Sequence, residues 1–214
     1  MVRFIAVVYS LVCYAIGVAA LVSLILFIAD LFIPVTVNTG SPLAPRLTGA
    51  LAIAWNVGLI ALWGLQHTYM ASPGFKAWWT QYMPARIERS TYLVFVAAMT
   101  AGLILFWVPL PATYWDISGT LAGNSLLIVY FFGWAITLLA TFLINHFHLF
   151  GLQQAWQQID HTQSKVVSFR TPFLYKLVRH PMMTGMIVSL WAIPHLTLGR
   201  LVLTLAFTVY ILVG

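Results

Sequence analysis

The sequence predicts an all-α fold, a polytopic transmembrane helical bundle with five to six spans. The first observation is composition, because 62% of the 214 residues are hydrophobic, 7% are charged and the mean hydropathy is +0.95. Soluble domains contain roughly 45–50% apolar and about 25% charged residues, so this chain has too little polar surface for a water-soluble globule. The second observation is that the apolar runs are continuous rather than alternating, which favours helices over a membrane β-barrel.

Six apolar stretches follow one another along the chain. The first four are each long enough for a span, which takes about 20 residues. The last two are shorter and Pro194 lies near the end of the fifth, so they form either two full spans or a tight helical hairpin. Between the second and third stretches, residues 71–90 combine basic residues with Trp78 and Trp79, which predicts a short interfacial helix. The six stretches are residues 4–32, 47–67, 91–110, 125–149, 181–195 and 198–214.

The charged residues indicate how the bundle is oriented. The net charge of +6 comes from basic residues that occur singly between apolar runs, which favours a lipid bilayer as partner and argues against nucleic acid. Arg3 and the second and fourth loops hold eight of the ten Lys and Arg residues, whereas the opposite side holds Arg46 and Arg200. The positive-inside rule therefore predicts that the N-terminus and these two loops face the cytoplasm.

This orientation gathers most of the polar side chains at the cytoplasmic mouth of the bundle. Polar residues at membrane depth usually face a cavity or a partner, so the sequence predicts a site there. His146 and His148 lie about 200° apart around a helix, so both cannot face one pocket and we predict no metal site. The residues at this mouth are His67, Glu88, Arg89, His146, His148, Arg179 and His180, whereas Asp30, Asp116 and His195 fall toward the other side.

Residues 175–185 (YKLVRHPMMTG) form the most informative segment. Pro181 suits the first turn of a helix, where its missing N–H is no loss. Arg179 and His180 lie just before it, where a polar ligand could meet free backbone N–H groups. Gly185 removes a side chain one turn later and allows close approach of another helix or of a ligand. A basic juxtamembrane anchor with a routine helix start explains the same residues, so both interpretations stay open at this point.

Several blocks of the sequence resemble one family of membrane enzymes. The Arg179-His180-Pro181 tripeptide with Gly185 resembles the S-adenosylmethionine-binding signature of isoprenylcysteine carboxyl methyltransferase-like membrane enzymes. Residues 65–79 (LQHTYMASPGFKAWW), 84–92 (PARIERSTY) and 141–152 (TFLINHFHLFGL) resemble the methanethiol S-methyltransferases and the related NnrU-like proteins. Residues 169–181 (FRTPFLYKLVRHP) and 191–197 (WAIPHLT) favour the methanethiol branch.

The resemblance implies a function and roles for particular residues. It implies transfer of a methyl group from S-adenosylmethionine to a small thiol, methanethiol, by an integral protein of a bacterial inner membrane with its active site facing the cytoplasm. His146 is the first candidate for the base that removes the thiol proton, His67 is the second, and Arg89 is the candidate that stabilises the thiolate. The resemblance assigns cofactor binding to Tyr175, Arg179, His180 and Pro181, with Gly185 leaving the cofactor room.

Two departures from the family pattern bear on this interpretation. His148 stands where the pattern has an acidic residue. Family members also continue past the last span with a cytoplasmic tail that carries a Glu-Glu pair, whereas residues 1–214 form a single membrane domain that stops inside an apolar run at Gly214. We therefore expect a truncated sequence. Two other functions stay open, namely an NnrU-like accessory protein without thiol methylation and a membrane cytochrome with haem held by two histidines.

Overall fold

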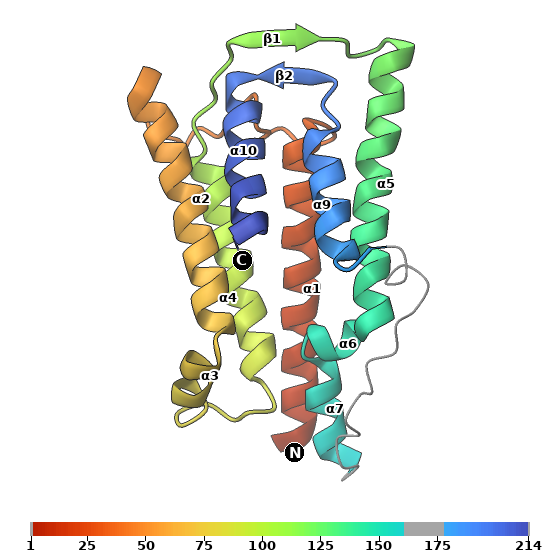
Figure 1. Cartoon of the computed structure of the whole chain (residues 1–214). Coiled ribbons are helices and arrows are strands. Elements are labelled where there is room, and N and C mark those ends of the chain that lie inside the picture. Colours follow the sequence, from red (N-terminus) through yellow and green to blue (C-terminus); the bar gives the residue numbers. More distant parts are fainter. Residues whose placement is uncertain (1, 161–177, 214) are drawn as a thin grey trace.

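The computed structural model describes residues 2–160 and 178–213 of the chain. In this part of the protein, four helices are long and apolar enough to cross a membrane, which confirms the predicted helical membrane bundle. They contain 19 to 28 residues each and lie side by side (Figure 1). At about 1.5 Å per residue the shortest reaches about 28 Å, close to the ~30 Å of a hydrocarbon core. The four are α1 (Val2–Ala29), α2 (Gly49–Ala71), α4 (Glu88–Phe106) and α5 (Leu121–Ile144).

Two shorter helices, α9 (Pro181–Trp191) and α10 (Leu198–Val213), complete the bundle. The 11 residues of α9 extend about 16 Å and the 16 residues of α10 about 24 Å, so both are shorter than the four long helices. They are antiparallel to each other and both lie on the same side of strand β2 (His195–Thr197), which joins them (Figure 1). α9 packs against α5, and α10 packs against α2.

A two-stranded antiparallel sheet at one end of the bundle corrects the all-α prediction. Strand β1 (Thr113–Asp116) pairs with β2, with Thr113 opposite Thr197 and Asp116 opposite His195. The threonine and aromatic residues of β1 favour an extended chain, but strands of four and three residues are too short for alternation to reveal them in the sequence. We call this end of the molecule the sheet end (Figure 1).

The opposite end carries the N-terminus and three short helices, and we call it the N-terminal end (Figure 1). Helix α3 (Pro73–Trp79) confirms the short helix predicted in residues 71–90. Its N-cap is Ser72, whose hydroxyl accepts a hydrogen bond from the N–H of Phe75. Helices α6 (His146–Leu149) and α7 (Leu152–Asp160) follow α5. The sequence did not predict α7, because its glutamines made residues 151–180 look like a polar loop.

The fourth apolar stretch was predicted to run as one helix to Leu149, and this is wrong. Helix α5 ends at Ile144, and Asn145 adopts an extended backbone with φ 163°. The side-chain oxygen of Asn145 then accepts a hydrogen bond from the N–H of His148 at 3.0 Å. Asparagine competes well for such helix-starting bonds, so the chain turns and begins α6 instead of extending α5.

Glycines bring α5 and α9 into close contact. A Cβ atom added to Gly185 would lie 2.5 Å from the backbone oxygen of Gly133 and 2.5 Å from the hydroxyl oxygen of Thr137, both on α5. The missing side chain at Gly185 is therefore accounted for by helix packing, which is one of the two alternatives that the sequence left open. This contact fixes α9 along the length of α5.

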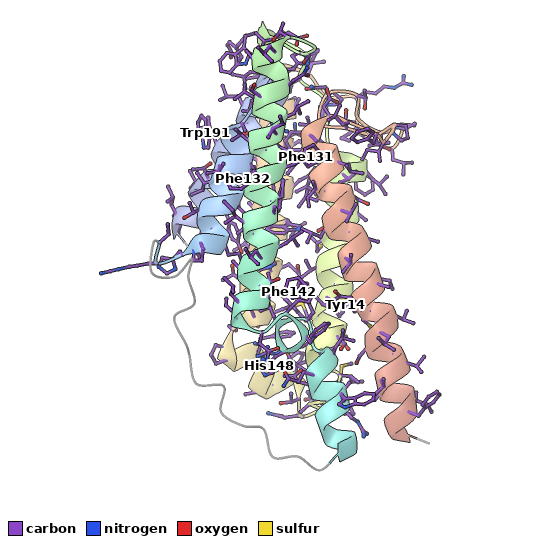
Figure 2. All side chains as sticks on the ribbon, turned by 90° about the vertical axis from the view of Figure 1, so that its right-hand side faces the viewer. Tyr14, Phe131, Phe132, Phe142, His148 and Trp191 are labelled. Carbon is purple, nitrogen blue, oxygen red and sulfur yellow. The ribbon has the colours of Figure 1, made fainter. Side chains whose placement is uncertain are left out.

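Large apolar side chains cover the outside of the bundle. Phe132 and Phe142 on α5 and Trp191 on α9 lie on its outer surface (Figure 2), where they are 62%, 55% and 49% exposed. Soluble monomers rarely expose contiguous apolar surface of this kind. Lipid tails would cover it, so the surface supports an integral membrane protein.

Polar side chains cluster at the sheet end. The side-chain amide of Asn38 donates to a carboxylate oxygen of Asp30 at 2.8 Å and lies 3.5 Å from Nδ1 of His195. Its oxygen accepts a hydrogen bond from the hydroxyl of Thr197 at 2.7 Å. Asp30 ends α1 in the left-handed region, with φ 60°. Asp30 and His195 therefore both lie beside Asn38, at the end of the molecule opposite α6 and α7.

Candidate active site

His146 begins α6 and lies at the junction of three helices. It is 5% exposed and its ring stacks on Phe142 of α5, with ring centroids 4.1 Å apart. Its Nε2 lies 2.8 Å from the hydroxyl of Tyr14 on α1, and its Nδ1 lies 2.7 Å from the hydroxyl of Thr141 on α5. Both ring nitrogens of the first candidate base are therefore hydrogen-bonded.

His148 faces in a different direction, toward the start of α4. Arg89 donates a hydrogen bond to its backbone oxygen at 2.9 Å and lies 3.2 Å from its ring nitrogen Nδ1. Gly151, with φ 82°, makes this approach close, since a Cβ there would lie 2.9 Å from the backbone nitrogen of Ser90. The structure therefore brings Arg89 to His148, and it places the contacts of His146 and His148 on different helices.

The environment of α6 favours the neutral form of both of its histidines. Burial lowers the pKa of His146 below its usual range. Burial is also the larger cause for His148, and the positive charge of Arg89 lowers the pKa of His148 further. A neutral imidazole can accept a proton, so His146 is in the correct state to act as a base near pH 7.

His67, the second candidate base, lies in a separate aromatic cluster. Its ring stacks on Trp63 with centroids 5.1 Å apart. Its Nδ1 lies 3.2 Å from the hydroxyl of Tyr210 on α10, and Tyr92 donates a hydrogen bond to its backbone oxygen at 3.2 Å. Because these neighbours differ from those of His146, the structure does not bring the two histidines into contact.

The start of α9 carries most of the predicted cofactor residues. Pro181 occupies the first turn of α9, as the sequence predicted, and His180 is the N-cap but makes no side-chain cap bond. Arg179 and His180 are exposed. Tyr175 lies outside the described residues.

Two threonines on successive turns of α5 connect these regions. The hydroxyl of Thr137 lies 3.0 Å from the backbone oxygen of Gly133 on α5 and 3.3 Å from that of Met182 in the first turn of α9, and it shares its proton between them. The hydroxyl of Thr141, four residues later, contacts His146. Residues four apart lie on the same helix face, about 6 Å apart along the axis. The start of α9 and His146 are therefore held next to each other by one face of α5.

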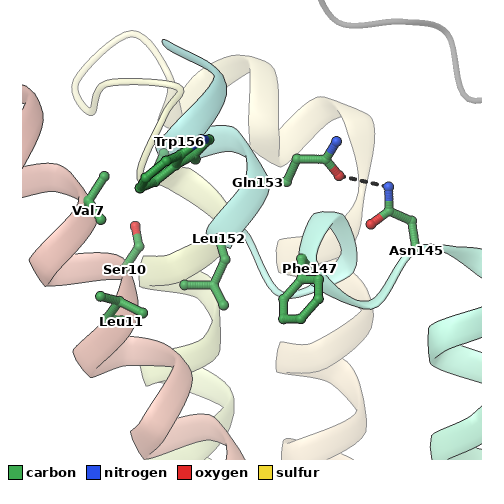
Figure 3. A pocket seen from close by; sticks show the side chains of 9 residues that line it. Val7, Ser10, Leu11, Asn145, Phe147, Leu152, Gln153 and Trp156 are labelled. Atoms are coloured by element: carbon green, nitrogen blue, oxygen red, sulfur yellow. Dashed lines mark hydrogen bonds between the residues drawn. The ribbon is translucent and has the colours of Figure 1, made fainter. Parts of the chain in front are cut away.

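A pocket of about 500 Å³ opens between α1 and the segment from Asn145 through α7. Figure 3 shows its apolar walls, with Leu11 on one side and Phe147 and Leu152 on the other. Its polar groups include Asn145, whose side-chain amide donates to Gln153 at 2.7 Å. Asn145 and Phe147, the two chain neighbours of His146, therefore both line the pocket.

Some residues of this site could not be chosen from the sequence. Tyr14 lies in the middle of the first apolar stretch, Thr141 in the fourth, and Tyr210 near the end of the last. Each contacts a histidine from a distant part of the chain or across a helix break. The only available signal was a polar hydroxyl group within an apolar span, which also occurs in ordinary helix packing.

The fold and the site define a polytopic helical membrane protein with histidine, tyrosine and arginine side chains grouped toward one end. Among known proteins, a methanethiol S-methyltransferase of a Pseudomonas species is 37% identical over 206 residues, covering 96% of this chain and 78% of its own length. One from Bradyrhizobium diazoefficiens is 38% identical, covering 99% and 73%, and one from Mycobacterium tuberculosis is 36% identical, covering 99% and 85%. The chain belongs to the methanethiol S-methyltransferase family.

A more distant relative lies outside this group. Nurim from Sus scrofa is 26% identical over 167 residues, covering 74% of this chain and 63% of its own length. No family model matches the chain, and no solved structure matches it. The assignment to the family therefore depends on the methanethiol S-methyltransferases that match nearly the whole of this chain.

Proposed function

We propose that this protein transfers a methyl group from S-adenosylmethionine to methanethiol, which yields dimethyl sulfide. The observation that carries the proposal is the placement of the α9 start and His146 on adjacent turns of α5, through Thr137 and Thr141. One face of one helix thus joins the predicted cofactor residues to the predicted base. Relatives named methanethiol S-methyltransferase at 36–38% identity support the same reaction.

The start of α9 fits an anionic group of the cofactor. Its first-turn N–H groups have no side-chain cap, and helix N-termini favour negative charge. Arg179 and His180 are exposed beside it and would bind a carboxylate, with Tyr175 as a further contact. Pro181 supplies the rigid helix start, and Gly185 seats α9 on α5. When bound, S-adenosylmethionine would supply an electrophilic methyl group.

The protein's own residues must align the thiol and remove its proton. Alignment of two reactants can be worth several kcal/mol, and even cysteine, with a pKa of about 8.5, is mostly protonated at pH 7. His146 is the proposed base because it is neutral and lies next to the α9 start. Arg89 and His67 would act less directly, since Arg89 holds α6 through His148 and His67 is stacked within the cluster around Trp63.

The membrane setting suits such a substrate. Methanethiol is small and lipid-soluble, so it could reach the pocket beside Leu11 and Phe147 from the bilayer. We also propose that α9 and α10 lie within the membrane as a hairpin of two short spans, and that the N-terminal end faces the cytoplasm, where S-adenosylmethionine is made. Arg3, Lys76, Arg86 and Arg89 belong to this end and follow the positive-inside rule.

A direct assay tests the proposal. Purified protein receives S-adenosylmethionine and methanethiol, and gas chromatography of the headspace measures dimethyl sulfide. We expect turnover in the wild type, weaker cofactor binding in His180→Ala, and slower turnover with cofactor binding retained in His146→Ala. His195→Ala, at the sheet end, serves as the matched histidine control and should keep both properties. Cofactor binding without any dimethyl sulfide would contradict the proposed reaction and favour another acceptor or an accessory role.

A further inference from the structure

The hydrogen bonds around His146 favour one tautomer of its ring. Thr141 lies 2.7 Å from both the backbone oxygen of Leu138 and Nδ1 of His146, and both contacts are hydrogen bonds only if Thr141 donates its single proton to Leu138. Toward His146 Nδ1, at 2.7 Å, Thr141 can therefore only accept. Nδ1 thus carries the proton and Nε2 carries the lone pair, so Tyr14 donates its hydroxyl proton to Nε2 across 2.8 Å.

This arrangement leaves His146 without an open nitrogen for a thiol. The ring is 5% exposed and both nitrogens are engaged. The hydroxyl oxygen of Tyr14, by contrast, uses its proton for Nε2 and keeps lone pairs that can accept another hydrogen bond. Tyr14 is only partly buried. Of the two groups, the oxygen of Tyr14 is the one with lone pairs left to accept a hydrogen bond from a thiol.

We propose that Tyr14 is a catalytic residue that passes the thiol proton to His146, an inference that rests on the proposed function. The S–H bond of methanethiol breaks and its proton goes to the oxygen of Tyr14, while the original Tyr14 proton moves to Nε2 of His146. The electron pair of the S–H bond stays on sulfur and forms the new S–CH₃ bond. The electron pair of the broken sulfonium C–S bond leaves with S-adenosylhomocysteine. The imidazolium of His146 then returns its proton to water.

The pocket between α1 and α7 lies on the same face of α1 as Tyr14. Its α1 wall includes Ser10 and Leu11, which lie four and three residues before Tyr14 and therefore on the same helix face. Its opposite wall includes Asn145 and Phe147, on either side of His146. At about 500 Å³ and with mostly apolar walls, it can admit a small thiol from the bilayer.

A second tyrosine on α1 offers a matched control. The hydroxyl of Tyr9 bonds to the hydroxyl of Thr91 on α4 at 2.9 Å. This contact joins α1 to a neighbouring helix just as the contact between Tyr14 and His146 does, but it does not involve a base. If Tyr14 only holds α1 against α6, Tyr14→Phe and Tyr9→Phe should have similar effects.

The experiment compares turnover and its pH profile in the wild type, Tyr14→Phe, Tyr9→Phe and His146→Gln. We expect kcat at pH 7 to fall about 100-fold in Tyr14→Phe and His146→Gln, within the range for loss of general base catalysis, and less than threefold in Tyr9→Phe. In Tyr14→Phe only thiolate already formed in solution reacts, so kcat/KM should rise about tenfold per pH unit between pH 6 and 8. The wild-type rate should instead level off above the pKa of His146.

A second readout does not require turnover. Among the described residues, those facing His146 are Tyr14, Thr141, Phe142, Phe147 and Phe150, and of these only Tyr14 has an ionisable side chain. A bond donated to the Nε2 lone pair stabilises the neutral ring and lowers the pKa of His146. Nitrogen NMR of labelled histidine should therefore show a protonated Nδ1 in the wild type and a higher pKa of His146 in Tyr14→Phe.

The outcomes separate this inference from the proposed function. If the wild type forms dimethyl sulfide and Tyr14→Phe matches Tyr9→Phe in kcat and pH profile, the proton relay is wrong and the function stands. If the wild type forms none, the proposed function fails and the relay fails with it. An unchanged pKa of His146 in Tyr14→Phe would also overturn the relay, because it would show that the bond to Nε2 does not exist in solution.

Discussion

Asn38 connects the end of α1 to strand β2 at the sheet end. Its amide donates to Asp30 at the end of α1, and its oxygen accepts from Thr197 in β2. Thr197 is 1% exposed, so its hydroxyl has little access to water. A single side chain thus holds the end of α1 to the strand that connects α9 and α10.

Asn38→Ala should destabilise the protein by about 1–3 kcal/mol, because it leaves the buried hydroxyl of Thr197 without its acceptor and removes a donor from Asp30. Thermal unfolding of the purified protein in detergent measures this effect. Asn124→Ala is the matched control, since Asn124 lies exposed in the first turn of α5 at the same end, and its effect should stay within about 0.5 kcal/mol. Equal midpoints for the two variants would show that the Asn38 contacts contribute nothing.

Among the secondary-structure elements, helix α5 is the one that positions the other parts of the candidate active site. Gly133 and Thr137 contact α9, and Thr141 contacts His146. The contact between Gly133 and Gly185 sets how closely α9 approaches, and a side chain at either position would separate the two helices. A change in this contact should therefore affect both stability and the start of α9.

Gly185→Ala tests this role of the helix contact. The added methyl group would meet the backbone oxygen of Gly133 at 2.5 Å, so the variant should lose about 1–3 kcal/mol of stability and bind S-adenosylmethionine more weakly. Gly102→Ala is the control, because a Cβ at Gly102 in α4 would have nothing within 4 Å. It should be neutral or stabilise the helix by up to about 1 kcal/mol. Thermal unfolding and calorimetric cofactor binding measure both, and wild-type behaviour of Gly185→Ala would exclude tight α5–α9 packing.

At the scale of the whole molecule, the two ends of the bundle differ in charge and chemistry. The N-terminal end holds Arg3, Lys76, Arg86 and Arg89, together with α6 and the pocket. The sheet end holds β1, β2 and the cluster around Asn38. From the positive-inside rule we propose that the N-terminal end faces the cytoplasm.

Labelling of single cysteines in intact cells tests the orientation. The native Cys13 is 1% exposed and should stay unreacted with a membrane-impermeant maleimide. Ser118→Cys, exposed at the sheet end, should react in intact cells, whereas Gln81→Cys, exposed after α3 at the N-terminal end, should react only after lysis. The reverse pattern would place the candidate active site on the outer side of the membrane.

The apolar stretches predicted most of the helices, and where the predicted helices differ from the structure the cause is local. Five of the stretches correspond to one helix each, with ends shifted by a few residues. The fourth predicted stretch was too long because the side chain of Asn145 caps a new helix. A hydrophobicity pattern does not detect such a hydrogen bond between a side chain and the backbone. Helix α7 was missed because its glutamines are as common in loops, and the tiny sheet was missed because its strands are too short for a pattern.

The sequence by itself determined the class of protein, the family blocks and the candidate residues His146, Arg179 and His180, because composition and local motifs lie within short stretches of chain. Only the tertiary structure decided which of them meet. It joined Tyr14 to His146 across 132 positions of sequence, brought Arg89 to His148 and assigned Gly185 to helix packing. The physical reason is that the pairing of side chains depends on how helices rotate and pack against one another, and hydrophobic patterning specifies the apolar face of a helix but not its neighbours.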